Sequence, residues 1–288
     1  MATMMAILLA VSARGDTASE GVAARADSIV VHNTSIKAFP YAYYTPETQF
    51  AVGFGGIATF YTADDHDLRP SKVGLSGYYT SNKQYKITVN PEVYFSRNRY
   101  FAGMNLHFGH YVDKFYGIGN DTPDLGTEQF VSDRYGIELQ VETPPLFFVS
   151  DRAGLVYDFE HMDMVDPEEN EYLADGEVTG SEGGNVSGLG GEWIWDRRNH
   201  SFYPTHGDLH NFKVMIYSEE VGSDFTYWTF EHDDRRYIAL AEDKVLAIQG
   251  YISMAIGDAP FTRLPALGGQ NRMRGYYCLL YTSPSPRD

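Results

Sequence analysis

Hydrophobic and polar residues alternate along much of this chain, and this period of two constrains its fold more than any other feature. In residues 85–96 the odd positions are Tyr85, Ile87, Val89, Pro91, Val93 and Phe95, whereas the even positions are mostly polar. The same alternation occurs in residues 137–142 and 245–256. Successive side chains of a β-strand point to opposite faces, so each stretch predicts a strand with one apolar face. Strands of soluble sandwiches run to about 5–6 residues, and longer patterned segments favour tilted strands that cross a membrane.

Composition narrows the class of protein further. The chain has 288 residues, 43% of them hydrophobic, with 22 Tyr, 17 Phe and 28 Gly, a composition that suits a membrane β-barrel and excludes a disordered chain. No run of 18 apolar residues occurs, which excludes a bundle of membrane-spanning helices. The formal net charge of −17 disfavours nucleic acid as a partner, because such binding relies on neutralising phosphates.

The alternation predicts ten strands and no helix longer than two turns. The predicted strands cover residues 48–62, 71–81, 84–97, 99–112, 127–143, 146–161, 184–197, 207–218, 224–240 and 243–257. A lysine on the lipid face near the middle of the membrane costs about 2–4 kcal/mol, so Lys86 and Lys213 are expected on a polar inner face. Pro91 lacks a backbone donor and indicates either a bulge or a position at the membrane rim.

The polar clusters in the predicted loops do not indicate a metal site or a catalytic site. The stretch 162–183 is rich in acidic residues, and its spacing fits no EF-hand, which favours a solvated surface loop over a divalent-cation site. His200, His206 and His210 surround one turn, where a polar turn explains them better than a metal. The chain has no G-x-S-x-G motif. The sequence therefore indicates no catalytic residue, metal ligand or cofactor.

The two ends differ from the patterned middle. Residues 1–26 hold a short apolar stretch followed by small residues, which favours a secretory signal, although no Lys or Arg precedes it. Residues 278–288 read CLLYTSPSPRD and lack the pattern. One back-translation of that string is a common transposase adapter used in DNA sequencing, so we expect the native part of this sequence to end at Tyr277 and residues 278–288 to be foreign. Residues 27–277 are then the barrel, and Cys278, the one cysteine, carries no argument.

Four segments resemble the BamA/TamA-type outer-membrane assembly barrels, a family also called bacterial surface antigens. They are Tyr44–Thr48 with the glycine-rich stretch 52–56, then residues 115–122, then Trp195–Asn199 with Pro204 and Gly207, and finally Leu267–Tyr276. The third resembles the family's Asp-x-Arg-Asp…Pro…Gly turn, with Asn199 where Asp is frequent. The last resembles its Gly-Gly…Arg-Gly-aromatic loop, with Met273 where a branched aliphatic is usual. Each segment is weak alone, but the four occur in the family's order.

The resemblance implies an all-β fold, a transmembrane antiparallel barrel of about sixteen strands of which roughly the first eleven are present. One strand is then missing from the ten, within Ser28–Phe39 or Asp124–Glu142. The resemblance also implies two groups of site residues. The lumen-loop motif is Gly268, Gly269, Arg274, Gly275 and Tyr276, whose arginine would contact the inner wall. The turn motif is Asp196, Arg197, Arg198, Pro204 and Gly207.

The function implied by the resemblance is non-enzymatic insertion or translocation of other outer-membrane proteins, or movement of lipid, in the outer membrane of a Gram-negative bacterium. Its partners would be outer-membrane lipid and client proteins, and too few residues precede the first strand for periplasmic repeats. A passive pore or surface antigen is one alternative, and an outer-membrane enzyme acting on lipid is another. An open sheet leaves unpaired edges in lipid, so the 288-residue chain alone is expected not to form a stable barrel.

Overall fold

One large antiparallel sheet makes up most of the described structure. The computed structural model describes residues 7–8, 34–45, 49–64, 68–115, 118, 129–144, 151–165, 173, 176–200, 203–241, 244–267 and 280–281. The strands of the sheet are β1 (Ile7–Leu8), β2 (Ser35–Thr45), β3 (Gln49–Phe60), β4 (Ser71–Thr80), β5 (Tyr85–Phe95), β6 (Tyr100–Lys114), β7 (Gln129–Thr143), β8 (Arg152–Val165), β9 (Gly183–Asp196), β10 (Gly207–Tyr217), β11 (Tyr227–Ala241) and β12 (Lys244–Gly257). Two short 3-10 turns, η2 (Glu219–Val221) and η3 (Phe261–Arg263), and a two-stranded pair, β13 (Ala266–Leu267) and β14 (Leu280–Tyr281), complete the described elements.

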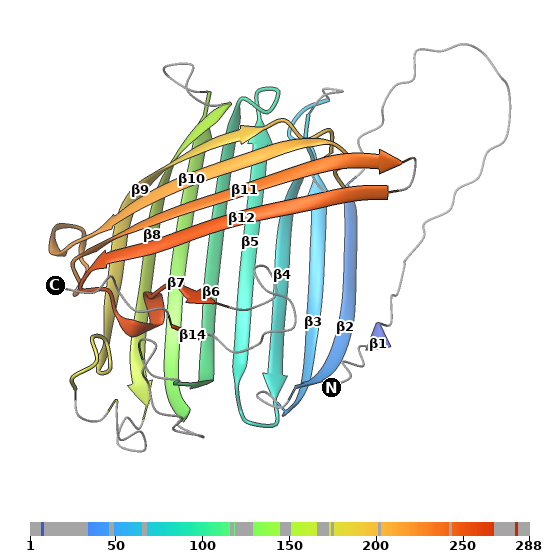
Figure 1. Ribbon diagram of the computed structural model, residues 1–288. Helices are drawn as coiled ribbons and strands as arrows, with labels where there is room; N and C mark the ends of the chain where they lie inside the picture. Colours follow the sequence, from blue (N-terminus) through green and yellow to red (C-terminus); the bar gives the residue numbers. More distant parts are fainter. Residues whose placement is uncertain are drawn as a thin grey trace, which may run out of the picture.

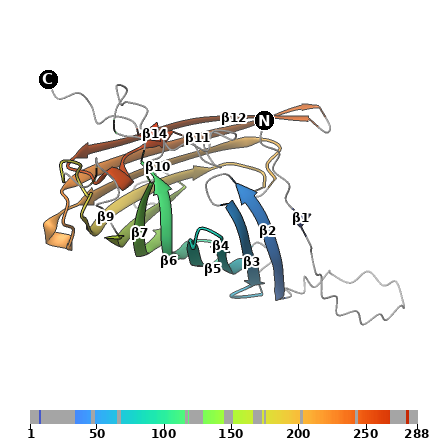
Figure 2. The same ribbon diagram turned by 90° about the horizontal axis from the view of Figure 1, so that it is seen from below.

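Each strand pairs with the next along the chain, and the sheet curls round on itself. Figure 1 shows β2 to β7 side by side at the back, while β10 to β12 cross obliquely in front. The view from below shows that the curled sheet stays open, with β2 and β12 at its two sides (Figure 2). No helix in the described ranges is both long and apolar enough to cross a lipid bilayer.

Contacts between strands that are not neighbours identify the inner face of the curl. Lys213 Nζ on β10 lies 2.8 Å from Glu138 Oε2 on β7, and His107 Nε2 on β6 lies 3.0 Å from Glu160 Oε2 on β8. Such contacts can form only across the concave side. The register of β5 with β6 puts Lys86 on the same side as His107. The prediction that both lysines face inward is therefore confirmed.

The strand count and one detail of the sequence analysis need correction. Eleven strands of 10–15 residues are present, so the prediction of ten was one short, and the missing strand is β2, which overlaps the first of the two places named for it. Polar and apolar residues alternate poorly in β2, because the exposed hydrophobic residues Ile36 and Phe39 lie at an even and an odd position and therefore on opposite faces. The expected bulge at Pro91 is wrong, since the pairing of β5 with β4 and β6 keeps its register on both sides. The rim position of Pro91 stays a prediction.

The hydrophobic core lies inside the curl, at the end where β12 finishes. Its buried residues come from β7 to β11 and from the connections between strands: Phe115, Phe130, Val156, Leu173, Val186, Met215, Tyr217, Tyr227, Ala259, Phe261 and Leu264. Three of them, Ala259, Phe261 and Leu264, belong to the segment that follows β12. The segment that follows β12 therefore packs against the inner wall as part of this core.

Candidate functional site: the loop root inside the barrel

Residues 258–267, which follow β12 and which we call the loop root, turn back into the barrel. Gly257 begins the turn with a φ of 109°, a left-handed conformation that favours glycine. The Asp258 N–H then donates to the Thr226 carbonyl at 3.0 Å. The Phe261 N–H donates to the Thr179 carbonyl at 2.9 Å. These two backbone hydrogen bonds fix the direction in which the loop root enters.

Phe261 is the apolar anchor of the loop root. Its side chain is fully buried, with 0% of its surface exposed. The ring meets Phe115 and Phe130 edge to face, with centroids 5.4 and 5.2 Å away. Edge-to-face pairs add to the free energy of burial because the ring edge is positive and the ring face negative. Phe261 therefore ties the loop root to β7 and to the residue that follows β6.

Arg263 is the charged anchor of the loop root. Its Nη1 lies 3.1 Å from Asp158 Oδ2, and its Nε lies 3.4 Å from Glu160 Oε1, an ion-pair distance without hydrogen-bond geometry. The Tyr217 hydroxyl also donates to Asp158 at 3.0 Å, and His107 contacts the other oxygen of Glu160. Burial alone lowers the pKa of Arg263, but the charges of Glu160 and Asp158 outweigh burial and raise that pKa above its ordinary value. The arginine thus joins the loop root to β8, and through its partners to β6 and β10.

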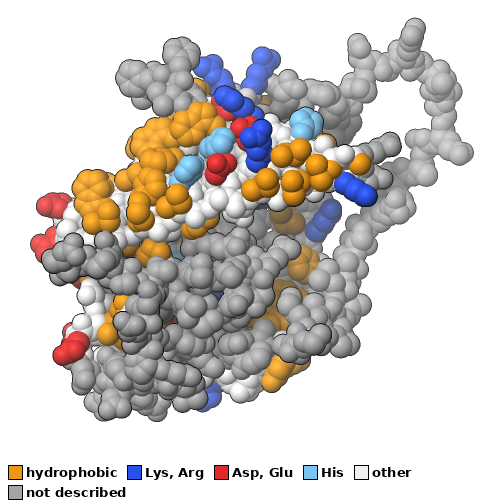
Figure 3. Space-filling view, viewed as in Figure 1, with side chains coloured by type: hydrophobic (Ala, Val, Ile, Leu, Met, Phe, Trp, Pro, Cys, Tyr) orange, Lys and Arg blue, Asp and Glu red, His pale blue; other side chains and the backbone are white. Residues whose placement is uncertain are grey.

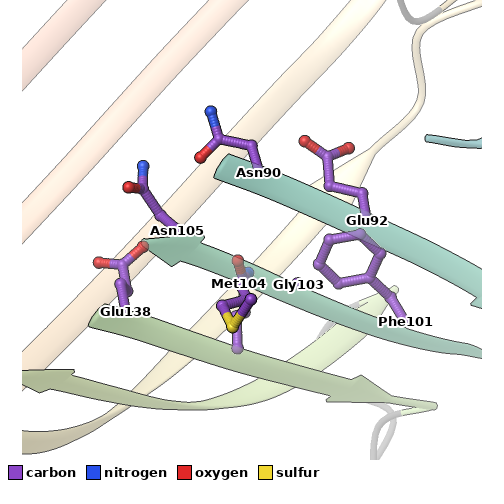
Figure 4. A pocket seen from close by; sticks show the side chains of 8 residues that line it. Asn90, Glu92, Phe101, Gly103, Met104, Asn105 and Glu138 are labelled. Atoms are coloured by element: carbon purple, nitrogen blue, oxygen red, sulfur yellow. The ribbon is translucent and has the colours of Figure 1, made fainter. Parts of the chain in front are cut away.

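A polar hollow lies beside this anchored region, on the inner wall formed by β5, β6 and β7. It has a volume of about 220 Å³. Figure 4 shows the carboxylates of Glu92 and Glu138 and the amides of Asn90 and Asn105 around it. Carboxylates and amides can hydrogen-bond water or an extended backbone. The inner wall is therefore polar away from the core, as expected for a membrane barrel.

The turn motif lies at the opposite end of the sheet, between β9 and β10. Arg198 donates from Nε and Nη2 to the two carboxylate oxygens of Asp196, at 2.8 and 2.9 Å. These hydrogen bonds raise the pKa of the Arg198 guanidinium. The Arg197 N–H donates to the Asp208 carbonyl at 2.9 Å, and Gly207 has a φ of 106°. The structure thus brings Asp196 and Arg198 together and gives Gly207 a conformation that needs glycine.

Other predicted positions fall elsewhere. Pro204 lies in the same turn without a contact to Asp196 or Arg198 among those described. Gly268, Gly269, Arg274, Gly275 and Tyr276 of the lumen-loop motif lie outside the described residues. Most acidic residues of 162–183 do so too. His200 stacks on Tyr203 with ring centres 3.4 Å apart, whereas His210 contacts Asp208 and Asp234.

Sequence reasoning missed Phe261 and Arg263. A signal for Arg263 was nevertheless present in the predicted strand 146–161, where Val156, Asp158 and Glu160 share one face. Two carboxylates on an inner face need a cation, because unpaired buried charge is unfavourable. The sequence cannot say which cation meets them, since Arg263 lies about a hundred residues away along the chain.

These observations define a class of protein: a curled antiparallel sheet with an apolar outside, a polar inside and a loop anchored within is the wall of an outer-membrane β-barrel. Residues 69–279 match the Omp85 superfamily domain, and the chain belongs to this superfamily. The fold is similar to that in the crystal structure of BamA from Haemophilus ducreyi lacking POTRA domains 1-3, with a TM-score of 0.53 and 17% sequence identity over 85% of this chain. The chain spans about half, 46%, of that structure's chain. No curated protein matches the chain in sequence.

Proposed function

We propose that this protein is a non-enzymatic outer-membrane barrel that inserts or translocates other outer-membrane proteins. The observation that best supports this function is that Arg263, placed between Asp158 and Glu160, holds the loop root inside the barrel. An anchor of this kind keeps the wall in shape from within while a client strand pairs with it.

The side of the sheet at β2 suits a client strand. Only two residues of β1 pair with β2 in the described part of the chain. Ile36 and Tyr44 on β2 are 76% and 64% exposed. An unpaired strand edge is a template on which another strand can add through backbone hydrogen bonds. We infer that clients pair here and that the protein reaches the outer membrane through the periplasm, directed by residues 1–26.

A passive pore is the second candidate, and the loop root argues against it. The core around Phe261 fills the inside of the curl where β12 ends, together with Phe115, Leu173 and Tyr227. An open pore needs a continuous water-filled lumen. Packed aromatic rings at that end narrow the space inside the curl where the loop root is docked.

The test uses the protein from its natural gene, reconstituted in lipid vesicles. An unfolded eight-stranded outer-membrane barrel is added, and its folding is followed as the fraction that shifts on an unheated gel. The proposal expects folding several-fold faster than in empty vesicles and slower folding for Arg263→Gln. Arg152→Gln is the matched control, because Arg152 pairs with Glu142 on the inner wall, outside the loop root. Ion conductance with no effect on client folding would favour the pore.

A further inference from the structure

An apolar band covers the outer face of β12. The inward contact of Tyr217 with Asp158, and its pairing with Tyr227, fix which residues of β10 and β11 face outward: the even-numbered ones. Trp228 pairs with Ile256, so even-numbered residues of β12 face outward as well. The large hydrophobic side chains at these outward positions of β12 are 43–64% exposed and include Leu246, Ile248, Ile252, Met254 and Ile256. Figure 3 shows this hydrophobic surface over the front strands.

Histidine and charged side chains interrupt this band on the neighbouring strands (Figure 3). On β11 the outward positions between Phe230 and Ile238 are His232, Asp234 and Arg236. Asp234 pairs with Gly250, which lies midway along the band of β12. A tilted strand crosses the apolar part of a membrane in about 9–11 residues, so Asp234 lies near mid-depth. Charged groups are unfavourable there and are retained where they bind something.

The side chains at this interruption converge on one point. His210 on β10 is the register partner of Asp234, and its Nδ1 lies 3.1 Å from Asp234 Oδ1. One ligand atom from each of His210, His232 and Asp234 lies within 4.8 Å of the others. Bonds of about 2.0–2.1 Å from Zn²⁺ to nitrogen or oxygen put two ligands of a tetrahedral site roughly 3.3 Å apart. The observed separation of His210 and Asp234 is close to that requirement.

A second carboxylate orients the histidine. Asp208 Oδ2 lies 3.0 Å from Nε2 of His210, on the side of the ring away from Asp234. A metal-binding histidine commonly donates its other N–H to a carboxylate, which fixes the tautomer and makes the ligating nitrogen more basic. Asp208 and Asp234 together also carry the charge that balances a divalent cation. His210 is thus held with Nδ1 directed at the point of convergence.

We propose that His210, His232 and Asp234 bind a divalent transition metal of the Zn²⁺ class on the membrane-facing surface, with Asp208 as the positioning residue for His210. Two imidazoles and one carboxylate are a donor set that suits Zn²⁺, and three protein ligands leave one coordination position for water or a donor from a neighbouring molecule. The metal binds side chains of two paired strands and replaces the direct contact of His210 with Asp234.

The test is a titration of the chelator-treated protein from its natural gene, in detergent micelles, with Co²⁺ alone. Four-coordinate Co²⁺ gives visible absorption, and Zn²⁺ displaces it. We expect that absorption with the unmodified protein, at least about 10-fold weaker binding for His232→Ala and Asp234→Asn, and about 10–100-fold weaker binding for Asp208→Asn. His206→Ala is the matched control, since His206 lies in the turn beside Thr205, and it should leave binding unchanged.

Absence of the Co²⁺ absorption would overturn the proposal, as would absorption that persists at full strength in both His232→Ala and Asp234→Asn. The isosteric Asp234→Asn keeps the test decisive if the alanine variant fails to fold. Because the readout is metal binding, its result is independent of any effect on client folding.

Discussion

Replacing Arg263 by glutamine should release the loop root from the inner wall. The substitution removes the charge that lies between Asp158 and Glu160 and keeps most of the side-chain volume. Both carboxylates are largely enclosed, with 9% and 14% of their side chains exposed. Once the arginine is gone, docking the loop root no longer neutralises them. The docked state therefore loses stability relative to the state in which the loop root is free.

The size of the loss follows from the burial of the three groups. Removing one partner of a buried ion pair costs about 3–5 kcal/mol. Arg263 has a quarter of its side chain exposed, at 25%, and Glu160 keeps its contact with His107, so a smaller value applies here. We expect about 2 kcal/mol, which corresponds to roughly a 30-fold change in the docking equilibrium.

Hydrogen exchange of the Phe261 amide measures that equilibrium directly. This N–H donates to the Thr179 carbonyl only when the loop root is docked, so its protection reports the free energy of local opening. In outer-membrane vesicles, we expect protection to fall roughly 30-fold for Arg263→Gln and by less for Arg263→Lys, which keeps the charge. Arg152→Gln serves as the control, because it breaks a comparably buried pair with Glu142 of β7, and Arg152 stands at the start of β8, before Asp158 and Glu160.

Unchanged protection of Phe261 in Arg263→Gln would refute the reasoning, because the ion pair would then contribute nothing to docking. An equal fall in Arg152→Gln would refute it as well, since the effect would then be a general loosening of the barrel.

Three further predictions concern stability and the chain itself. Gly207→Ala should lower the free energy of unfolding by about 2 kcal/mol in guanidinium titrations. Gly222→Ala should lower it by less. Both glycines have a left-handed φ, but only at Gly207 would an added methyl group overlap a backbone carbonyl. Lys213→Met should cost about 1 kcal/mol, since its partner Glu138 is 40% exposed, and Glu138→Gln in the same chain should recover part of it in a double-mutant cycle. Amplification from source DNA should yield codons after Tyr277 that differ from the adapter-like tail.

The faces of the strands could be predicted from sequence because a period of two is local. The alternation, together with the cost of a lysine that faces lipid, predicts that Lys86 and Lys213 lie on the inner face, and the contact of Lys213 with Glu138 confirms this for Lys213. Lipid outside and water inside impose opposite side-chain preferences on successive residues. The alternation does not predict β2, because its residues break the pattern: Ile36 and Phe39 are both exposed although they lie on opposite faces of the strand.

The contacts that build the sites could not be predicted, because they depend on register between distant segments. His210 was grouped with His200 and His206, its neighbours in sequence, whereas the pairing of β10 with β11 sets it beside Asp234. Arg263 likewise meets Asp158 only because the loop root turns inward after β12. Alternation predicts on which face of the sheet a residue lies. It does not predict which residue on another strand lies opposite.

Side chains that bridge non-neighbouring strands across the concave face help to hold the curl of this sheet, as Lys213 does from β10 to β7. The loop root extends that bridging: Phe261 and Arg263 reach partners on or beside β6, β7 and β8 from the end of β12. The loop root therefore adds side-chain contacts to the backbone pairing that shapes the wall.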